Sequence, residues 1–113
     1  MKEFTYSLTV NNADLTKKNV REAAAVALEE IGLLAERYAK ELCPVDTGNL
    51  RNSITHTVDE ENLVAYLGTP VEYATYVEMG TSRMKAQPYI RPAFENHMGE
   101  YKDRLEKRLG TVI

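Results

Sequence analysis

The sequence predicts an α+β fold in which a small antiparallel sheet, an N-terminal strand plus a hairpin, packs against one long helix. Three observations predict it. Residues 3–10 alternate between apolar and polar side chains as in a half-buried strand, and residues 15–42 carry apolar side chains at helical spacing. Two short segments rich in β-forming residues, 53–58 and 63–67, flank the polar turn 59–62, which favours a hairpin.

The elements follow in chain order. In the strand, one face carries Phe4, Tyr6, Leu8 and Val10. In the long helix, steps of three and four place on one stripe Val20, Ala24, Ala27, Ile31, Leu34, Tyr38 and Leu42. Gly32 costs this helix roughly 1 kcal/mol against Ala, and Pro44 ends it because a residue before proline avoids the α region. At ~1.5 Å per residue the helix is about 40 Å long, so it spans the subunit or projects from it.

A short helix, a loop and a C-terminal helix complete the predicted order β-α-β-β-α-α. The short helix, Pro70–Met79, begins with a proline and ends before Gly80. Its inward face is either Val71, Ala74 and Val77 or Tyr73, Tyr76 and Val77. The irregular loop Gly80–Tyr89 leads to the last helix, from Pro92 to Leu109. The apolar stripe of that helix is Phe94, Met98, Tyr101, Leu105 and Leu109. Without repeats or linkers, the 113 residues are expected to form one domain over 1–113.

Composition excludes several classes of function. A net charge of −3 provides no basic face, so we expect no direct nucleic-acid recognition, although the chain has seven tyrosines that could stack on bases. One cysteine cannot form an internal disulfide. No apolar run approaches the ~20 residues that span a bilayer, and the N-terminus lacks a secretory signal, so we expect no membrane role and synthesis in a cytoplasm.

Candidate catalytic residues are few. Cys43 follows a helix C-terminus, where the dipole opposes a thiolate, so a buried or inert thiol is the better interpretation. His56 and His97 are interpreted as packing or surface residues rather than general bases, and no histidine or cysteine spacing is typical of a metal site. Glu72 and Glu78 are interpreted as solvated charges or rim contacts. We therefore expect no enzymatic activity, no catalytic or metal residues and no cofactor.

The distinctive residues instead shape the backbone. Gly80 suits the cap of the short helix better than a phosphate-binding loop, which uses several glycines. Residues 82–88 form a long basic loop with a methionine, and loops of this length are usually functional or mobile. A flexible connection and a loop that docks on a neighbouring subunit are both considered, and docking is favoured. The predicted turn and cap residues are Pro44, Asp46, Thr47, Gly48, Gly80, Pro88 and Pro92.

Three blocks, Cys43–Ile54, Val71–Met84 and Ala86–Ala93, carry a resemblance. They satisfy the patterns P-V-D-T-G-x-L-R-x-S, Y-A-x-x-V-E-x-G-T and Q-P-aromatic-aliphatic-x-P-A. In this order they resemble the gene-ten-like minor tail components of HK-type lambdoid tailed phages and prophages, over roughly residues 15–110. The resemblance implies a structural virion-assembly protein at the head–tail junction or tail end, similar to tail-completion and connector components. It brings no catalytic residues.

The resemblance also implies partners. The chain is expected to form a ring with its own copies, for which tail symmetry suggests six, and to contact neighbouring head–tail connector and tail-tube proteins. It would be found in the virion, and in the bacterial cytoplasm before assembly. The alternative is a prophage-encoded, non-enzymatic adaptor or regulatory binding module that acts as a monomer or dimer.

Specific residues can be assigned to these roles. Asp46 or Thr47 is expected to cap a turn that leads Leu50 and Arg51 into the first hairpin strand, with Gly48 at positive φ. Pro88 and Pro92 are expected to hold the loop extended, which lowers the cost of docking. The candidates for subunit contacts are Arg51, Arg83, Met84, Gln87, Tyr89 and Arg91.

Overall fold

The computed structural model describes residues 4–10, 17–44 and 48–110, and it confirms the α+β class. Strands β1 (Phe4–Thr9), β2 (Thr55–Asp59) and β3 (Val64–Thr69) form an antiparallel sheet in the order β1-β3-β2. β2 and β3 are the predicted hairpin. The central strand β3 is buried along most of its length, whereas the two edge strands are partly exposed.

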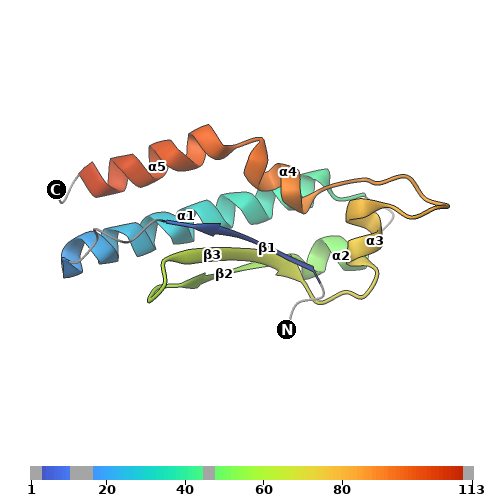
Figure 1. The fold of residues 1–113 in the computed structure, drawn as a ribbon, viewed down its shortest axis with the longest axis horizontal. Helices are drawn as coiled ribbons and strands as arrows, with labels where there is room; N and C mark the ends of the chain where they lie inside the picture. Colours follow the sequence, from blue (N-terminus) through green and yellow to red (C-terminus); the bar gives the residue numbers. More distant parts are fainter. Residues whose placement is uncertain (1–3, 11–16, 45–47, 111–113) are drawn as a thin grey trace.

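The long helix α1 (Lys18–Leu42) lies across one face of this sheet, and α5 (Met98–Gly110) runs beside α1 (Figure 1). Of the two predicted alternatives, α1 does not project from the subunit: it lies along the long axis of a molecule that measures 51 × 25 × 22 Å, and the loop after α3 extends beyond its end. α1 ends at Leu42 because Cys43, the residue before Pro44, is extended with ψ 134°. No described helix is both long and apolar enough to cross a membrane.

The core lies between α1 and the sheet and continues under the C-terminal helices. At its centre, Ile31 and Ala35 of α1 pack in one cluster with Leu67 of β3 and Phe94. Nearer the hairpin turn, a second cluster is formed by Ala24, Leu28, Leu63 and Ala65. The predicted stripe of α1 is largely confirmed, although Leu42, at the helix end, remains 46% exposed. Alanines on the buried face allow the helix to approach the sheet closely.

Leu63 closes the hairpin turn in an unusual conformation. Its φ is 54°, a left-handed value that costs a leucine about 1–2 kcal/mol. Its side chain is fully buried, and burial of a leucine contributes about 1.5–3 kcal/mol. Burial therefore outweighs the backbone cost and fixes the geometry of the turn.

The predicted turn into the first hairpin strand is wrong. Residues Gly48–Ser53 form a short helix, α2, so Leu50 and Arg51 are helical and β2 starts at Thr55. Gly48 is the first residue of this helix rather than the reversal point of a turn. Leu50 is fully buried, and the Ser53 hydroxyl donates to its carbonyl at 2.6 Å. Burial of Leu50 thus overrides the weak helix propensity of the segment.

The single C-terminal helix is also wrong. The structure has two helices, α4 (Ile90–Glu95) and α5, separated at Asn96 and His97. The His97 ring stacks on Tyr38 of α1 with ring centres 3.7 Å apart, which anchors the break. Met98, predicted to face inward, is 44% exposed. Pro92 lies within the first turn of α4, where its missing N–H is tolerated, rather than in the loop.

The short helix α3 (Ala74–Met79) is four residues shorter at its start than predicted. Of the two inward faces considered, the first is confirmed: Ala74 and Val77 are buried. The second face, with Tyr73 and Tyr76 inward, is wrong because both tyrosines are exposed.

Candidate assembly interface

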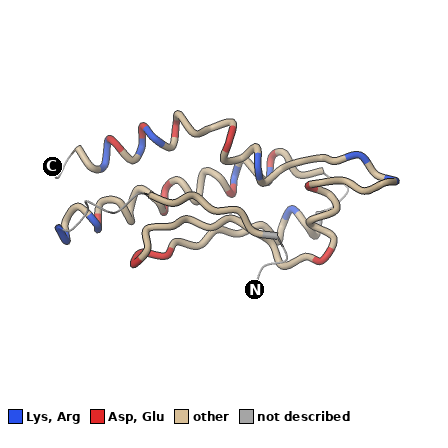
Figure 2. Tube along the Cα trace, in the orientation of Figure 1, with Lys and Arg blue, Asp and Glu red and all other residues tan. Residues whose placement is uncertain are grey.

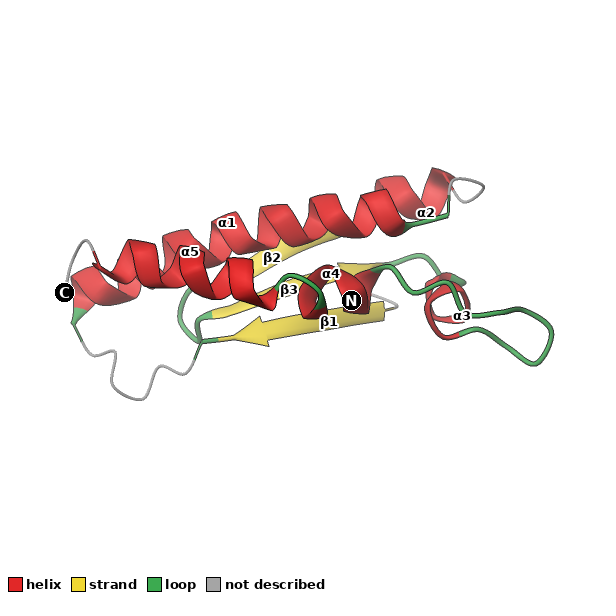
Figure 3. Cartoon of the chain, turned by 90° about the horizontal axis from the view of Figure 1, so that it is seen from above, coloured by secondary structure: helices red, strands yellow, loops and turns green. Residues whose placement is uncertain are grey.

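The loop between α3 and α4 projects from one end of the molecule beyond the rest of the fold (Figures 1 and 3). Every residue from Thr81 to Pro88 is exposed, which confirms the predicted irregular loop. Large apolar side chains gather at the same end: Tyr76 is 58% exposed and Met79 is 68% exposed. Tyr73 and Met84 are exposed to a smaller extent. Clustered exposed apolar side chains of this kind mark interaction surfaces.

Gly80 fixes the base of the loop. Its φ is 76°, and its N–H donates to the Tyr76 carbonyl at 2.8 Å, so it caps α3 as predicted. A Cβ at this position would lie 2.6 Å from the backbone nitrogen of Ala86 and 2.9 Å from the carbonyl oxygen of Met84. Only glycine satisfies both the left-handed conformation and this close approach.

Backbone hydrogen bonds close the loop on itself. The Thr81 N–H donates to the Met84 carbonyl at 2.8 Å, and the Thr81 hydroxyl accepts from the N–H groups of Arg83 and Met84. The Gln87 N–H donates to the Val77 carbonyl at 2.8 Å and returns the chain to α3. The loop is therefore built on main-chain contacts, and the side chains of Arg83 and Met84 are exposed on a defined backbone.

Glu78 joins the two ends of the loop. Its side chain is buried, and its carboxylate accepts from the N–H groups of Tyr89, Ile90 and Arg91 at 3.0, 2.9 and 3.1 Å. These N–H groups begin α4 and have no partner within that helix, so the carboxylate caps it. The interpretation of Glu78 as a solvated or rim charge is wrong. Glu72, by contrast, is exposed as predicted.

The structure separates the six candidate contact residues. Arg83, Met84 and Gln87 share the loop and are exposed. Tyr89 is completely buried, with its hydroxyl 3.3 Å from the Ala74 carbonyl, so its side chain supports the loop from within. Burial raises the Tyr89 pKa, which keeps the hydroxyl protonated as a donor.

The remaining candidates lie elsewhere. Arg91 is in α4 and pairs with Glu95 at 2.9 Å. Arg51 is exposed on α2 and lines a separate hollow beside α1. Among the turn residues, Pro88 is exposed in the loop, whereas Asp46 and Thr47 lie outside the described residues.

A charged cluster away from the loop was not foreseen from the sequence. His56 of β2 lies between two carboxylates of α1, with Nε2 2.7 Å from Glu29 and Nδ1 2.8 Å from Glu36. Its backbone N–H also donates to Glu36, at 3.1 Å. Carboxylates only accept hydrogen bonds, so the arrangement is satisfied when both ring nitrogens carry protons. Burial lowers the His56 pKa, but the hydrogen bonds to Glu36 and Glu29 outweigh it, and the pKa is raised overall.

Gly32 makes room for this histidine. A Cβ on Gly32 would lie 2.7 Å from Cδ2 of His56, closer than real contacts allow. The glycine that appeared only as a weak point of α1 is thus the position at which the ring packs against the helix. The signal was present in the sequence, because Glu29, Gly32 and Glu36 share one helical face.

The described residues provide no arrangement typical of catalysis. Cys43 is buried, as predicted. His56 is engaged on both ring nitrogens, and His97 is stacked on Tyr38. Within the described ranges, no group of three histidine, cysteine or acidic side chains is arranged to hold a metal ion. What the molecule does present is the loop, together with the exposed side chains of α3.

Comparison with protein families agrees with this interpretation. The family model described as "Bacteriophage HK97-gp10, putative tail-component" matches residues 9–80, well over half of the chain. The matched region contains the block Cys43–Ile54 and most of the second block, and it ends at Gly80, where the projecting loop begins. Comparisons with curated proteins and with solved structures found no match. The chain belongs to the HK97 gp10-like family of bacteriophage tail components.

Proposed function

We propose that this protein is a ring-forming tail-completion or connector component, which acts at the head–tail junction or tail end of a phage or prophage particle. Copies of the chain contact one another through the loop between α3 and α4, and the completed ring contacts neighbouring connector and tail-tube proteins. The protein works by assembly and not by catalysis.

The observation that supports this proposal is the construction of the loop end. Glu78, Gly80 and the backbone bonds around Thr81 hold a fully exposed loop in a defined shape. A folded monomer gains little from exposing Met79 and Met84 there, whereas a neighbour that covers them buries apolar area. Head-to-tail contacts repeat from copy to copy and can close into rings.

The test is the double variant Arg83→Glu with Met84→Asp. The hydrogen bonds that these residues make to Thr81 use their backbone atoms, so the thermal unfolding temperature of the monomer should be nearly unchanged. A loss of ~2 kcal/mol per contact weakens each pairwise equilibrium about thirtyfold, and the loss is repeated at every junction. Electron microscopy should therefore show no rings for this variant.

A matched control makes the same kinds of change on α5: Met98→Asp with Lys102→Glu. Met98 is exposed to a similar degree as Met84, and Lys102 forms an exposed pair with Glu106 at 3.9 Å. This control should assemble like the wild type. Normal rings from the loop variant would show that the loop is not the joint. An unfolded loop variant would show that these residues belong to the core.

A further inference from the structure

Charge distinguishes the loop tip from the turn between β2 and β3. The loop tip carries the sequence Arg83-Met84-Lys85, a methionine between two cations. Toward the opposite end of the long axis, the turn between β2 and β3 carries Glu60 and Glu61 (Figure 2). The loop tip is therefore basic with an apolar centre, and the β2–β3 turn is acidic.

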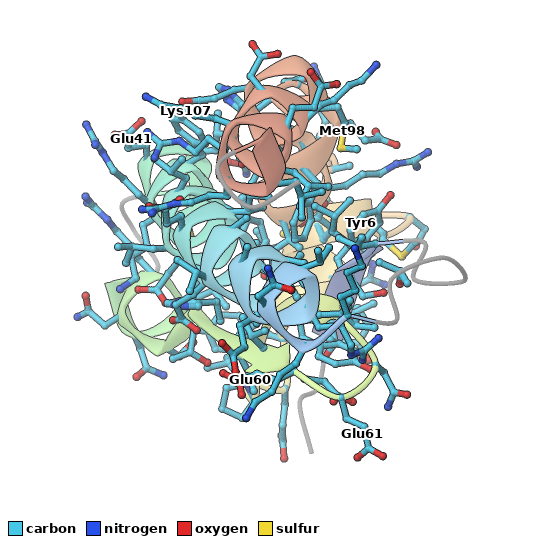
Figure 4. All side chains as sticks on the ribbon, turned by 90° about the vertical axis from the view of Figure 1, so that its left-hand side faces the viewer. Tyr6, Glu41, Glu60, Glu61, Met98 and Lys107 are labelled. Carbon is cyan, nitrogen blue, oxygen red and sulfur yellow. The ribbon has the colours of Figure 1, made fainter. Side chains whose placement is uncertain are left out.

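The acidic turn is held by several hydrogen bonds. The Asp59 carboxylate accepts from the N–H groups of Glu61 and Asn62, both at 3.1 Å, and from the Asn62 side chain at 2.8 Å. The Arg21 side chain of α1 donates to the Glu61 carbonyl, which ties the turn to the helix. Glu60 and Glu61 project from this turn (Figure 4).

An open hollow of about 850 Å³ lies between this turn and the first half of α1. Its apolar part is formed by Ala25 and Val26, and Val26 is 47% exposed. Glu60 and Glu61 line it from the turn. Lys18 and Arg21 also line it, but they are outnumbered by five glutamates, Glu22, Glu29, Glu30, Glu60 and Glu61, so the lining is acidic overall. An apolar surface flanked by carboxylates complements a methionine flanked by cations.

We propose that the loop of one copy docks into this hollow of a second copy. Met84 packs on Ala25 and Val26, and Arg83 and Lys85 lie beside Glu60 and Glu61. This inference rests on the proposed ring function and adds the identity of the receiving surface. Because the loop and the hollow lie at opposite ends of a 51 Å molecule, copies joined in sequence form a head-to-tail contact that repeats.

The first test uses charge reversal on both surfaces. Arg83→Glu with Lys85→Glu and, separately, Glu60→Lys with Glu61→Lys should each weaken self-association at least about tenfold. The chain that carries all four changes should recover association, because opposite charges face each other again. The matched control is Arg37→Glu with Glu41→Lys, which reverses an exposed pair on the far part of α1 and should leave association unchanged.

Disulfide trapping then locates the contact. Chains with Met84→Cys are mixed with chains with Val26→Cys under oxidation, with the buried Cys43 replaced by alanine in all of them. A crosslinked pair is expected. Leu33→Cys is the control for Val26→Cys, because Leu33 is at least as accessible on α1, at 59%, and lies outside the hollow. It should crosslink much less.

The outcomes separate this inference from the proposed function. One outcome would contradict the docking alone: the loop variant loses association, the turn variant keeps it, and the Met84→Cys and Val26→Cys chains do not crosslink. The loop would then be a joint between copies, but the hollow would not be the surface that receives it. If neither variant loses association, both the loop joint and the docking are wrong. A single chain that carries both Met84→Cys and Val26→Cys tests closure: a crosslinked product that stops at a dimer supports the docking and contradicts the ring.

Discussion

Glu78 illustrates how one side chain organises the loop end. It is the one acidic residue of α3, and it accepts hydrogen bonds from three successive N–H groups eleven to thirteen residues later. The sequence could not identify the partners of Glu78, because they are backbone groups whose positions depend on how the loop returns. An indication of the inward orientation was present, because Glu78 follows Val71 and Ala74 at steps of three and four and so shares the predicted inward face.

Replacing Glu78 with alanine should lower the free energy of unfolding by about 2–4 kcal/mol, because three N–H groups lose their acceptor in a poorly solvated place. Glu78→Gln, which keeps one carbonyl oxygen, should cost less. Urea unfolding followed by circular dichroism measures both. The exposed Glu72→Ala is the control and should change stability by no more than about 0.5 kcal/mol. Equal effects of Glu72→Ala and Glu78→Ala would refute the capping role.

At the scale of elements, the parts with strong periodicity were predictable and the parts set by single burial events were not. β1, α1 and the hairpin follow from alternation and from the helical stripe. α2 was missed because Leu50 alone holds a segment of weak helix formers. The division of α4 from α5 was missed because the apolar stripe continues across it, while the stacking of His97 on Tyr38 is a contact between distant residues.

The contact between α1 and β2 should be sensitive to pH through His56. The His56 pKa is raised above the ordinary value of 6.5. Its contribution to the free energy of unfolding is therefore fully present below pH 6.5 and is lost as the pH rises through the raised pKa. The Glu36 pKa is lowered from 4.5: burial opposes this shift, and hydrogen bonds from His56 and Lys40 outweigh burial. The Glu36 contribution is therefore present above 4.5 and lost only in stronger acid. The charge on His56 is affected by two carboxylates of α1, Glu29 and Glu36, and indirectly by Lys40, which is paired with Glu36.

The difference in unfolding free energy between the wild type and His56→Gln should thus be larger at about pH 5.5 than at about pH 8.5, by on the order of 1 kcal/mol. Denaturant unfolding at the two pH values measures it, and other titrating groups largely cancel in the difference. Repeating the comparison in a Glu36→Gln background should reduce the effect. A difference that does not vary with pH would contradict the charged arrangement.

For the whole molecule, the shape and charge distribution support an assembling part. The molecule is about twice as long as it is wide, with a basic, apolar loop at one end and an acidic hollow at the other. The sequence identified the loop and its exposed residues Arg83 and Met84, but not the hollow, which requires α1 and the β2–β3 turn to be placed side by side. The family to which the chain belongs shows that it is a component of phage tails.

The most direct measurement of the central claim is sedimentation velocity of the wild-type protein over a wide range of concentration. A ring closed by head-to-tail contacts predicts one oligomer of fixed mass that contains three or more copies of the 12.8 kDa chain. The fraction of the protein in this oligomer should grow with concentration, whereas its mass should stay the same. A protein that remains a monomer or a dimer at every concentration, or whose mass increases without limit, would contradict the claim.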